Sequence, residues 1–248
     1  MKAMILAAGL GTRLRPLTDD RPKALVQVAG RTLLEIALAR VRSLGIRDVI
    51  VNAHHFADLM IEYLQANDNF GMRITVSREE VLLDTGGGLK KAAPFFLENG
   101  SFDEPLLLHN VDVISDIDLC GMLRFHREHG ALATLAVQAR AASRYLLFDE
   151  RLQLCGRRKG REGESEWARR CAQPQALAFC GIHVISPRLL TLMTEEGAFS
   201  IISCYLRLAA QGEALLGFRV DGAYWRDLGR PESVRQAEQD RKEGVYLG

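Results

Sequence analysis

The sequence lacks any hydrophobic run that approaches the roughly 18 to 20 residues needed to span a bilayer. Its first apolar run, residues 3–8, is short and is followed at once by glycines and an arginine, which favours a first strand over a signal peptide. An excess of charge is also missing, because 32 Lys and Arg balance 31 Asp and Glu. We therefore expect neither a membrane partner nor a general nucleic-acid-binding surface.

Cysteines at the spacing of a zinc site are absent too. The chain has no CxxC pair, and an odd number of cysteines is scattered through apolar segments: Cys120, Cys155, Cys171, Cys180 and Cys204. This pattern favours free buried thiols in a reducing cytoplasm over disulfides or zinc. No Ser/His/Asp or Cys/His arrangement stands out, so a covalent mechanism has no support.

The first loop lacks both common phosphate-binding fingerprints. Leu14 stands where the third glycine of GxGxxG should follow Gly9 and Gly11, and GxxxxGK[ST] does not occur. What the loop does contain is cations, above all Arg13 and Lys23, directly after a short apolar strand. Glycine lets backbone N–H groups approach phosphate oxygens, and cations neutralise them. The loop therefore predicts a nucleoside triphosphate site; the alternative is a surface turn with solvated charges.

Strands and helices alternate beyond this loop. We expect strands over residues 48–53, 72–76 and 105–108 and helices over 32–44, 55–65 and 86–97, with Thr32 as a helix N-cap. This spacing predicts βαβ crossovers and a mainly parallel sheet, whose ligands bind beyond the carboxyl ends of the strands. After residue 130 we expect strands over 131–139, 145–148, 152–154, 176–185, 215–220 and 224–227, helices over 187–193, 200–210 and 231–242, and an exposed charged loop over 156–170.

Three consecutive glycines, Gly86 to Gly88, open the predicted helix of residues 86–97. Such a run allows a flat ring or a phosphate to lie directly on the backbone, where main-chain groups could read the edge of a base. The alternative is an ordinary flexible turn. We favour the approach of a ligand, because glycine is costly in a turn that does not require it.

Two aspartates are candidates for a magnesium site. Asp112 follows an apolar strand at the carboxyl edge of the sheet, and Asp227 lies between an aromatic pair and a turn. Magnesium on a triphosphate usually takes only one or two protein carboxylates. Asp116 and Asp118 follow Asp112 closely, but Asp118 is better placed to cap the helix that begins at Leu119.

Five segments together resemble the sugar-1-phosphate nucleotidyltransferases, also called NDP-sugar pyrophosphorylases. They cover essentially the whole chain in the order of that family's motifs: GLGTRLRPLTDDRPKAL, LLDTGGGLKKA, HNVDVISDIDL, FCGIHVISP and YWRDLGRPE. The resemblance is to short, single-domain members, such as the N-acetylmuramate-1-phosphate uridylyltransferases and the mannose- or heptose-1-phosphate guanylyltransferase-like proteins. It implies an α/β fold, a Rossmann-like three-layer αβα sandwich, with one domain over 1–248, a nucleotide part over about 1–130 and a sugar-phosphate part over about 131–248.

The resemblance also implies a reaction and a set of residues. An NTP and a sugar 1-phosphate would give an NDP-sugar and pyrophosphate, with Mg2+ as cofactor, in a monomer or small homo-oligomer. The implied catalytic residues are Arg13, Lys23 and Asp112, and the implied metal ligands are Asp112 and Asp227. The implied nucleotide-binding residues are Leu6, Ala7, Ala8, Gly9, Gly11, Thr12, Arg13, Lys23, Glu79, Gly86, Gly87 and Asn110. Those on the sugar side are Gly181, Asp112 and Asp227.

Two alternatives stay open at this point. A glycosyltransferase that consumes NDP-sugar usually carries a DxD metal motif, and Asp116 to Asp118 fits that string. A non-catalytic relative would bind nucleotide or sugar phosphate without turnover; Ser203, at a position where relatives often have Asp, motivates it. The sequence names neither the base nor the sugar. The transferase hypothesis requires Asp112 and Asp227 to face the loop that contains Arg13 and Lys23.

Overall fold

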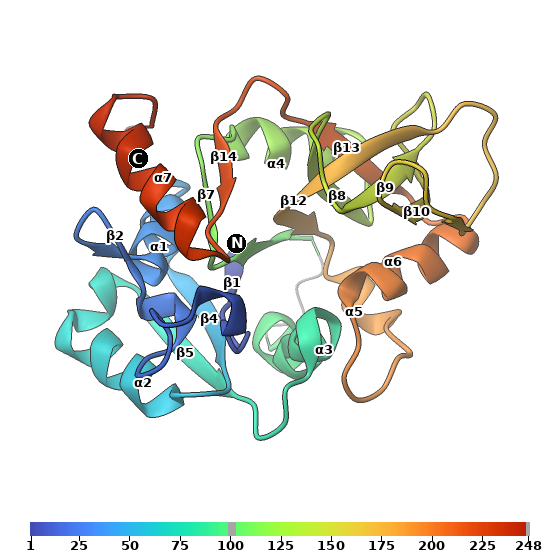
Figure 1. The fold of residues 1–248 in the computed structure, drawn as a ribbon. Coiled ribbons are helices and arrows are strands. Elements are labelled where there is room, and N and C mark those ends of the chain that lie inside the picture. The colour runs from blue at the N-terminus through green and yellow to red at the C-terminus, as the bar shows by residue number, and fades with distance from the viewer. Residues whose placement is uncertain (99–102, 247–248) are drawn as a thin grey trace.

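A ten-stranded mixed sheet runs through the middle of the protein (Figure 1). The computed structural model describes residues 1–98 and 103–246. The strands of this sheet are β1 (Lys2–Leu6), β4 (Asp48–Ala53), β5 (Arg73–Arg78), β6 (Leu106–Asn110), β8 (Ala133–Gln138), β9 (Arg144–Phe148), β10 (Leu154–Lys159), β11 (Ser165–Trp167), β12 (Gln175–Ile185) and β13 (Leu215–Arg219). Two short ribbons accompany it, β2 (Gln27–Val28) with β3 (Arg31–Thr32) and β7 (Val113–Ser115) with β14 (Trp225–Asp227).

The strand order is β11-β10-β9-β12-β6-β1-β4-β5, with β8 beside β12 and β13 beside β8. The neighbours β6, β1, β4 and β5 are parallel, whereas β12 runs antiparallel to β6, β8 and β9. Because parallel strands end at the same edge, the loops after β1 and β6 begin side by side. Strands from before and after residue 130 thus share one sheet.

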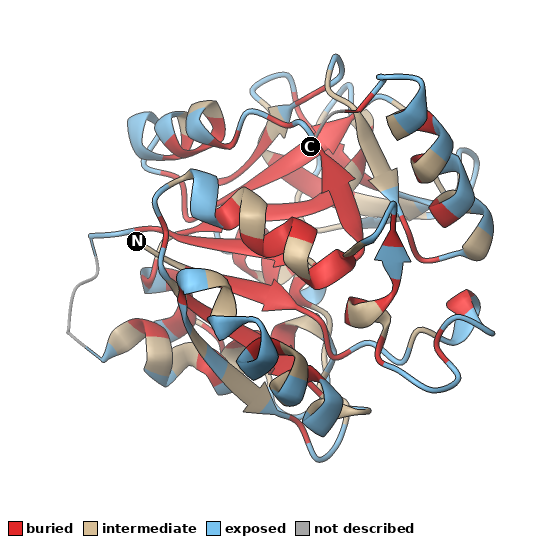
Figure 2. Cartoon of the chain, turned by 90° about the vertical axis from the view of Figure 1, so that its left-hand side faces the viewer, coloured by how far each residue is buried: buried red, intermediate tan, exposed pale blue. Residues whose placement is uncertain are grey.

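Helices cover both faces of the sheet. On one face lie α1 (Leu33–Ser43), α2 (Ala57–Ala66), α4 (Leu119–Glu128) and α7 (Pro231–Lys242), and on the other lie α3 (Asp84–Leu97), α5 (Arg188–Thr191) and α6 (Ile201–Ala210). Strand β1 shows why: Ala3 and Ile5 pack into the first core, while Met4 and Leu6 pack into the second, as the alternation of a strand requires. Figure 2 shows the buried strands between helices whose outer surfaces are exposed. The predicted three-layer sandwich is confirmed.

Local signals predicted the helix ends well. The Thr32 side chain accepts a hydrogen bond from Glu35 N at 3.1 Å and caps α1, and Asp118 Oδ1 accepts from Gly121 N at 2.9 Å and caps α4. Helix α7 spans the predicted residues 231–242. Among the described residues, no helix combines the length and the apolar character needed to cross a membrane.

The prediction of a charged exposed loop over residues 156–170 was wrong. Strand β10 continues through the first part of this segment to Lys159, and β11 pairs with it as the edge strand. Arg157 lies opposite Glu166, and the two side chains form an ion pair at 2.7 Å. Charged side chains are common on edge strands, where they oppose pairing with other chains, and they hide the usual apolar alternation.

Candidate functional site

The candidate site lies where two neighbouring parallel strands end. Leu6, the last residue of β1, is paired in register with Asn110, the last residue of β6. One residue further, Val111 N donates a hydrogen bond to Leu6 O at 3.1 Å. The loop after β1 and Asp112 after β6 therefore start from the same edge of the sheet, the edge at which α/β sheets bind ligands.

Lys23 closes the first loop onto Asp112. Its Nζ donates to Asp112 Oδ2 at 3.0 Å, and the two side chains are only 15% and 12% exposed. Gly9 makes room for this lysine, because a Cβ there would lie 3.2 Å from Lys23 Nζ. Gly11 has φ +65°, and its Cβ would lie 2.9 Å from Thr18 Cγ2. The two glycines thus allow the loop to fold tightly around the lysine.

The β7–β14 ribbon brings Asp227 to the same place. Leu228 N donates a hydrogen bond to Asp112 O at 2.8 Å. The residue that follows Asp227 is thus hydrogen-bonded to the main chain of Asp112. Asp227 Oδ1 accepts from Gly229 N at 2.7 Å. A Cβ on Gly229 would lie 2.7 Å from that same oxygen and 3.0 Å from Arg13 Nη2, so Arg13 and Asp227 are neighbours. Both aspartates therefore face the loop, as the transferase hypothesis requires.

Two carboxylates lie beside the cations of the loop, Asp112 at Lys23 and Asp227 at Arg13. Within residues 1–98 and 103–246, no group of three or more His, Cys, Asp or Glu side chains could hold a metal ion. Magnesium that binds together with a triphosphate needs only one or two protein carboxylates, since phosphate oxygens and water fill its other positions. The donor set fits an ion that arrives with the nucleotide.

Asn52, which the sequence analysis did not select, fixes the end of β1. Its Oδ1 accepts hydrogen bonds from Ala7 N at 2.7 Å and Ala8 N at 3.3 Å, and its Nδ2 donates to Glu79 Oε1 at 2.7 Å. Glu79 Oε2 accepts from Leu83 N at 3.0 Å. Asn52 and Glu79 are both buried, and their bonds satisfy polar groups that would otherwise be costly to bury. Contacts of Ala7, Ala8 and Glu79 with a base stay predictions; the structure places them in this supporting network.

A cleft of about 740 Å³ opens beside Asp227. Gly181 has φ +73° and lies where the pairing of β12 with β8 shifts register, and a Cβ there would lie 2.8 Å from Asn110 Nδ2. Glycine lets β12 pass close to that amide. The cleft brings predicted nucleotide-side and sugar-side residues together, and its lining includes Arg13, Asn110, Arg140, Gly181, Trp225 and Asp227.

Two other predicted nucleotide-binding residues have contrasting positions. Leu6 is buried in the sheet, so its side chain belongs to the core and only its main chain lies near the loop. Thr12 is exposed at the start of a short 3-10 turn. Their roles toward a nucleotide stay predictions.

Comparison with known proteins identifies the family. Residues 2–147 match the family model described as nucleotidyl transferase. The chain is 33% identical over 245 residues to the N-acetylmuramate alpha-1-phosphate uridylyltransferase of Caulobacter vibrioides, and the alignment covers 95% of each protein. The chain belongs to the nucleotidyl transferase family. The resemblance inferred from its motifs is thereby confirmed, as is its nature as a transferase enzyme.

A second relative aligns with most of this chain. The mannose-1-phosphate guanyltransferase of Yarrowia lipolytica is 29% identical over 238 residues, and the alignment covers 94% of this chain but 61% of that protein. Two solved structures share the fold. HddC from Yersinia pseudotuberculosis complexed with GMP-PN has a TM-score of 0.75 at 20% identity, with 96% and 98% of the chains covered. A putative glucose-1-phosphate thymidylyltransferase from Bacillus anthracis has a TM-score of 0.76 at 17% identity, with 96% and 94% covered.

In this nucleotidyl transferase, the three consecutive glycines lie inside helix α3 and pack against the protein itself. Gly86 N and Gly87 N donate to Phe199 O at 2.9 and 3.3 Å, and a Cβ on Gly86 would collide with the Phe199 ring. A Cβ on Gly88 would lie 2.8 Å from Glu79 Oε1. The close approach expected of a ligand is thus made by neighbouring segments. Contacts of Gly86 and Gly87 with a nucleotide stay predictions.

Gly86→Ala is expected to lower the free energy of unfolding by about 2 kcal/mol, because Phe199 must move to admit the methyl group. Gly222→Ala is the matched control, since a Cβ there would meet no described residue other than its chain neighbours within 4 Å. We expect that control to change stability by less than about 0.5 kcal/mol. Urea denaturation measures both variants, and equal stabilities would contradict the packing role of Gly86.

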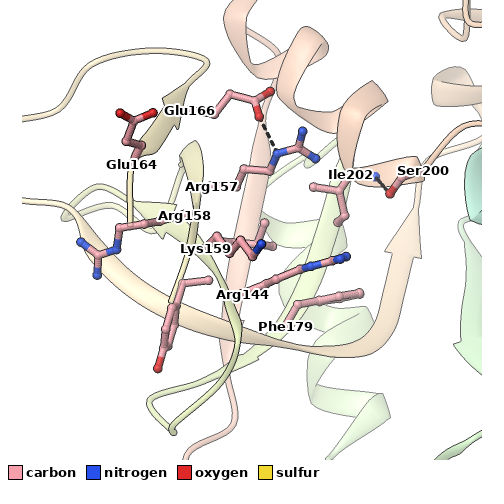
Figure 3. Close-up of a pocket in the computed structure, with 11 residues that line it drawn as sticks. Arg144, Arg157, Arg158, Lys159, Glu164, Glu166, Phe179, Ser200 and Ile202 are labelled. Atoms are coloured by element: carbon pink, nitrogen blue, oxygen red, sulfur yellow. Dashed lines mark hydrogen bonds and ion pairs between the residues drawn. The ribbon is translucent and has the colours of Figure 1, made fainter. Parts of the chain in front are cut away.

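A second cavity of about 550 Å³ adjoins the cleft and shares Arg144 and Phe179 with it. Lys159 lies opposite Arg144 across β9 and β10, and Figure 3 shows these two side chains next to each other, with Ile202 nearby. Neither cation has an ion-pair partner among the residues that the structure describes. Like charges directly opposite each other destabilise a strand pair. The second cavity therefore places two cations without an ion-pair partner among the described residues beside the cleft.

Proposed function

We propose that this protein joins a nucleoside triphosphate and a sugar 1-phosphate to give an NDP-sugar and pyrophosphate. The observation that carries the proposal is the Lys23–Asp112 ion pair, which closes the glycine-containing loop onto a carboxylate beside Asp227. The named activities of the uridylyltransferase and guanyltransferase relatives support a sugar 1-phosphate as acceptor.

The chemistry needs charge neutralisation and positioning more than a covalent group. An oxygen of the sugar phosphate attacks the α-phosphorus of the nucleotide, and the bond to the β-phosphate breaks in line with the attack. Both reactants are anions, so their approach must be screened and oriented. Lys23, held by Asp112, stabilises charge at the α-phosphate, and Arg13 neutralises the β- and γ-phosphates as pyrophosphate leaves.

The two aspartates would hold magnesium against the phosphates. Bound there, the ion would neutralise charge and hold the reacting phosphates in position. Lys23 and Asp112 already form a close ion pair, so the lysine is held near the phosphate position before any substrate binds. Gly229 N donates to Oδ1 of Asp227, and the other carboxylate oxygen, Oδ2, would bind the ion.

The structure does not favour the glycosyltransferase alternative. Asp116 Oδ1 accepts a hydrogen bond from Tyr224 N at 2.7 Å, and Asp118 caps α4. Both carboxylates of the DxD string are thus engaged in holding the chain. A non-catalytic relative would have no need to bring Arg13, Lys23, Asp112 and Asp227 together, and turnover separates it from an enzyme.

Release of pyrophosphate tests the proposal. UTP, GTP, CTP and dTTP are each combined with a panel of sugar 1-phosphates in the presence of Mg2+. We expect pyrophosphate only when both substrates are present, loss of the signal with EDTA, and recovery when Mg2+ is added in excess. Binding without pyrophosphate from any pair would indicate a non-catalytic relative, and turnover that survives EDTA would overturn the metal assignment.

A further inference from the structure

Arg140 occupies an unusual position in the cleft. It is half-buried, its guanidinium lies 3.6 Å from the centre of the Trp225 ring, and its Nη2 donates to Phe179 O at 3.0 Å. Trp225 is held in turn, because its Nε1 donates to Cys180 O at 2.8 Å. These contacts fix the guanidinium in one orientation against β12 and β14. An arginine fixed in this way is preorganised to bind a flat anionic group.

The charge of Arg140 lacks a close partner. None of the described carboxylates lies within ion-pair distance of Arg140, and its buried Nε has no hydrogen-bond partner. Burial lowers the pKa of this guanidinium from its ordinary value. A partly desolvated cation without a paired anion is costly, and such groups are typical of binding sites.

The cleft as a whole contains more positive than negative charge. Asp227 is the single carboxylate in its lining among the described residues, whereas five arginines line it: Arg13, Arg140, Arg144, Arg226 and Arg230. Of these five, only Arg226 forms an ion pair within the described part of the chain, with Asp240. Arg13 faces the nucleotide phosphates in the proposed reaction, which leaves Arg140, Arg144 and Arg230 on the acceptor side of the cleft. One acceptor phosphate does not balance three cations, so the cleft suits a ligand with a further anionic group.

The position of Arg140 relative to Asp227 fits such a ligand. Trp225 and Asp227 are two residues apart on β14 and line the same cleft. Two residues of a strand span roughly 7 Å, so the tryptophan on which Arg140 stacks is separated from Asp227 by about the length of a sugar ring. A sugar whose 1-phosphate lies at Asp227 can therefore extend a substituent to Arg140.

We propose that Arg140, stacked on Trp225, binds a carboxylate substituent of the acceptor, so that the enzyme prefers acidic sugar 1-phosphates. This inference rests on the proposed function, because it assigns a specificity residue to the same site. Arg140 is not placed at the reacting atoms. It selects the acceptor, and its loss is expected to raise KM for the acidic substrate with little change in kcat.

Paired acceptors that differ in one carboxylate test this inference. kcat/KM is measured for glucose 1-phosphate against glucuronate 1-phosphate, and for N-acetylglucosamine 1-phosphate against N-acetylmuramate 1-phosphate. We expect the wild type to prefer the acidic member of at least one pair. Arg140→Gln should lower kcat/KM for that acid by about 10- to 100-fold, the effect of losing a charged hydrogen bond, and leave the neutral member almost unchanged. Arg140→Lys should retain part of the preference.

Lys159→Gln is the matched control, because it removes a cation from the neighbouring cavity and should keep the preference of the wild type. An equal loss for both members of the pair in Arg140→Gln, or a wild type that prefers the neutral members, would overturn the inference while leaving the proposed function intact. A wild type that releases pyrophosphate with no acceptor would refute the proposed function itself. Thermal unfolding of each variant separates a specificity role from loss of structure.

Discussion

Replacing Asp112 by asparagine is expected to lower kcat of the transfer reaction by about 10³-fold, a typical loss when one group that stabilises transition-state charge is removed. Asparagine keeps the size of the side chain but removes the negative charge that holds Lys23 at 3.0 Å. It also removes one of the two carboxylates that fit magnesium. Pyrophosphate release under saturating substrates measures the effect.

Asp118→Asn is the control for this variant. Asparagine caps a helix about as well as aspartate, so α4 and the stability of the protein should be preserved. We expect the rate of the wild type. A loss in Asp118→Asn as large as that in Asp112→Asn would revive the DxD interpretation and contradict the assignment of Asp112.

Lys23→Ala is expected to lower kcat/KM by about 10³-fold and to destabilise the fold as well. The kinetic loss follows from removal of the cation at the α-phosphate. The stability loss, about 2 kcal/mol, follows because the mostly buried Asp112 carboxylate is left without its partner. Enzyme kinetics measures the first effect and urea denaturation the second.

An exposed lysine provides the comparison. Lys242 lies at the end of α7, away from the loop, and Lys242→Ala should change neither the rate nor the stability measurably. If Lys23→Ala unfolds at a lower urea concentration yet turns over like the wild type, Lys23 supports the loop only, and its catalytic role is refuted.

The features of this site that depend on neighbouring residues could be predicted from the sequence. Gly9 and Gly11 indicate a tight loop, and Asp112 comes directly after an apolar strand. Helix caps such as Thr32 depend on hydrogen bonds within a few residues. These features could be predicted because their causes lie close together in the chain. The meeting of Asp112 with Asp227 was required by the resemblance to a family rather than derived from spacing.

Features that depend on contacts far apart in the chain were missed. Asn52 looks like one polar residue in an apolar strand, and its importance comes from Ala7, Ala8 and Glu79 on other segments. The stacking of Arg140 on Trp225 is equally invisible, because it joins two distant strands. The roles of these residues depend on tertiary contacts, which the periodicity of the sequence does not reveal.

A crystal structure with Mg2+ and a non-hydrolysable nucleoside triphosphate analogue would show where the phosphates and the metal bind. We expect the triphosphate against the loop from Gly9 to Arg13, with Lys23 at the α-phosphate and the metal held by Asp112 and Asp227. A nucleotide bound in the basic cavity beside Lys159, with both aspartates free of metal, would contradict this expectation.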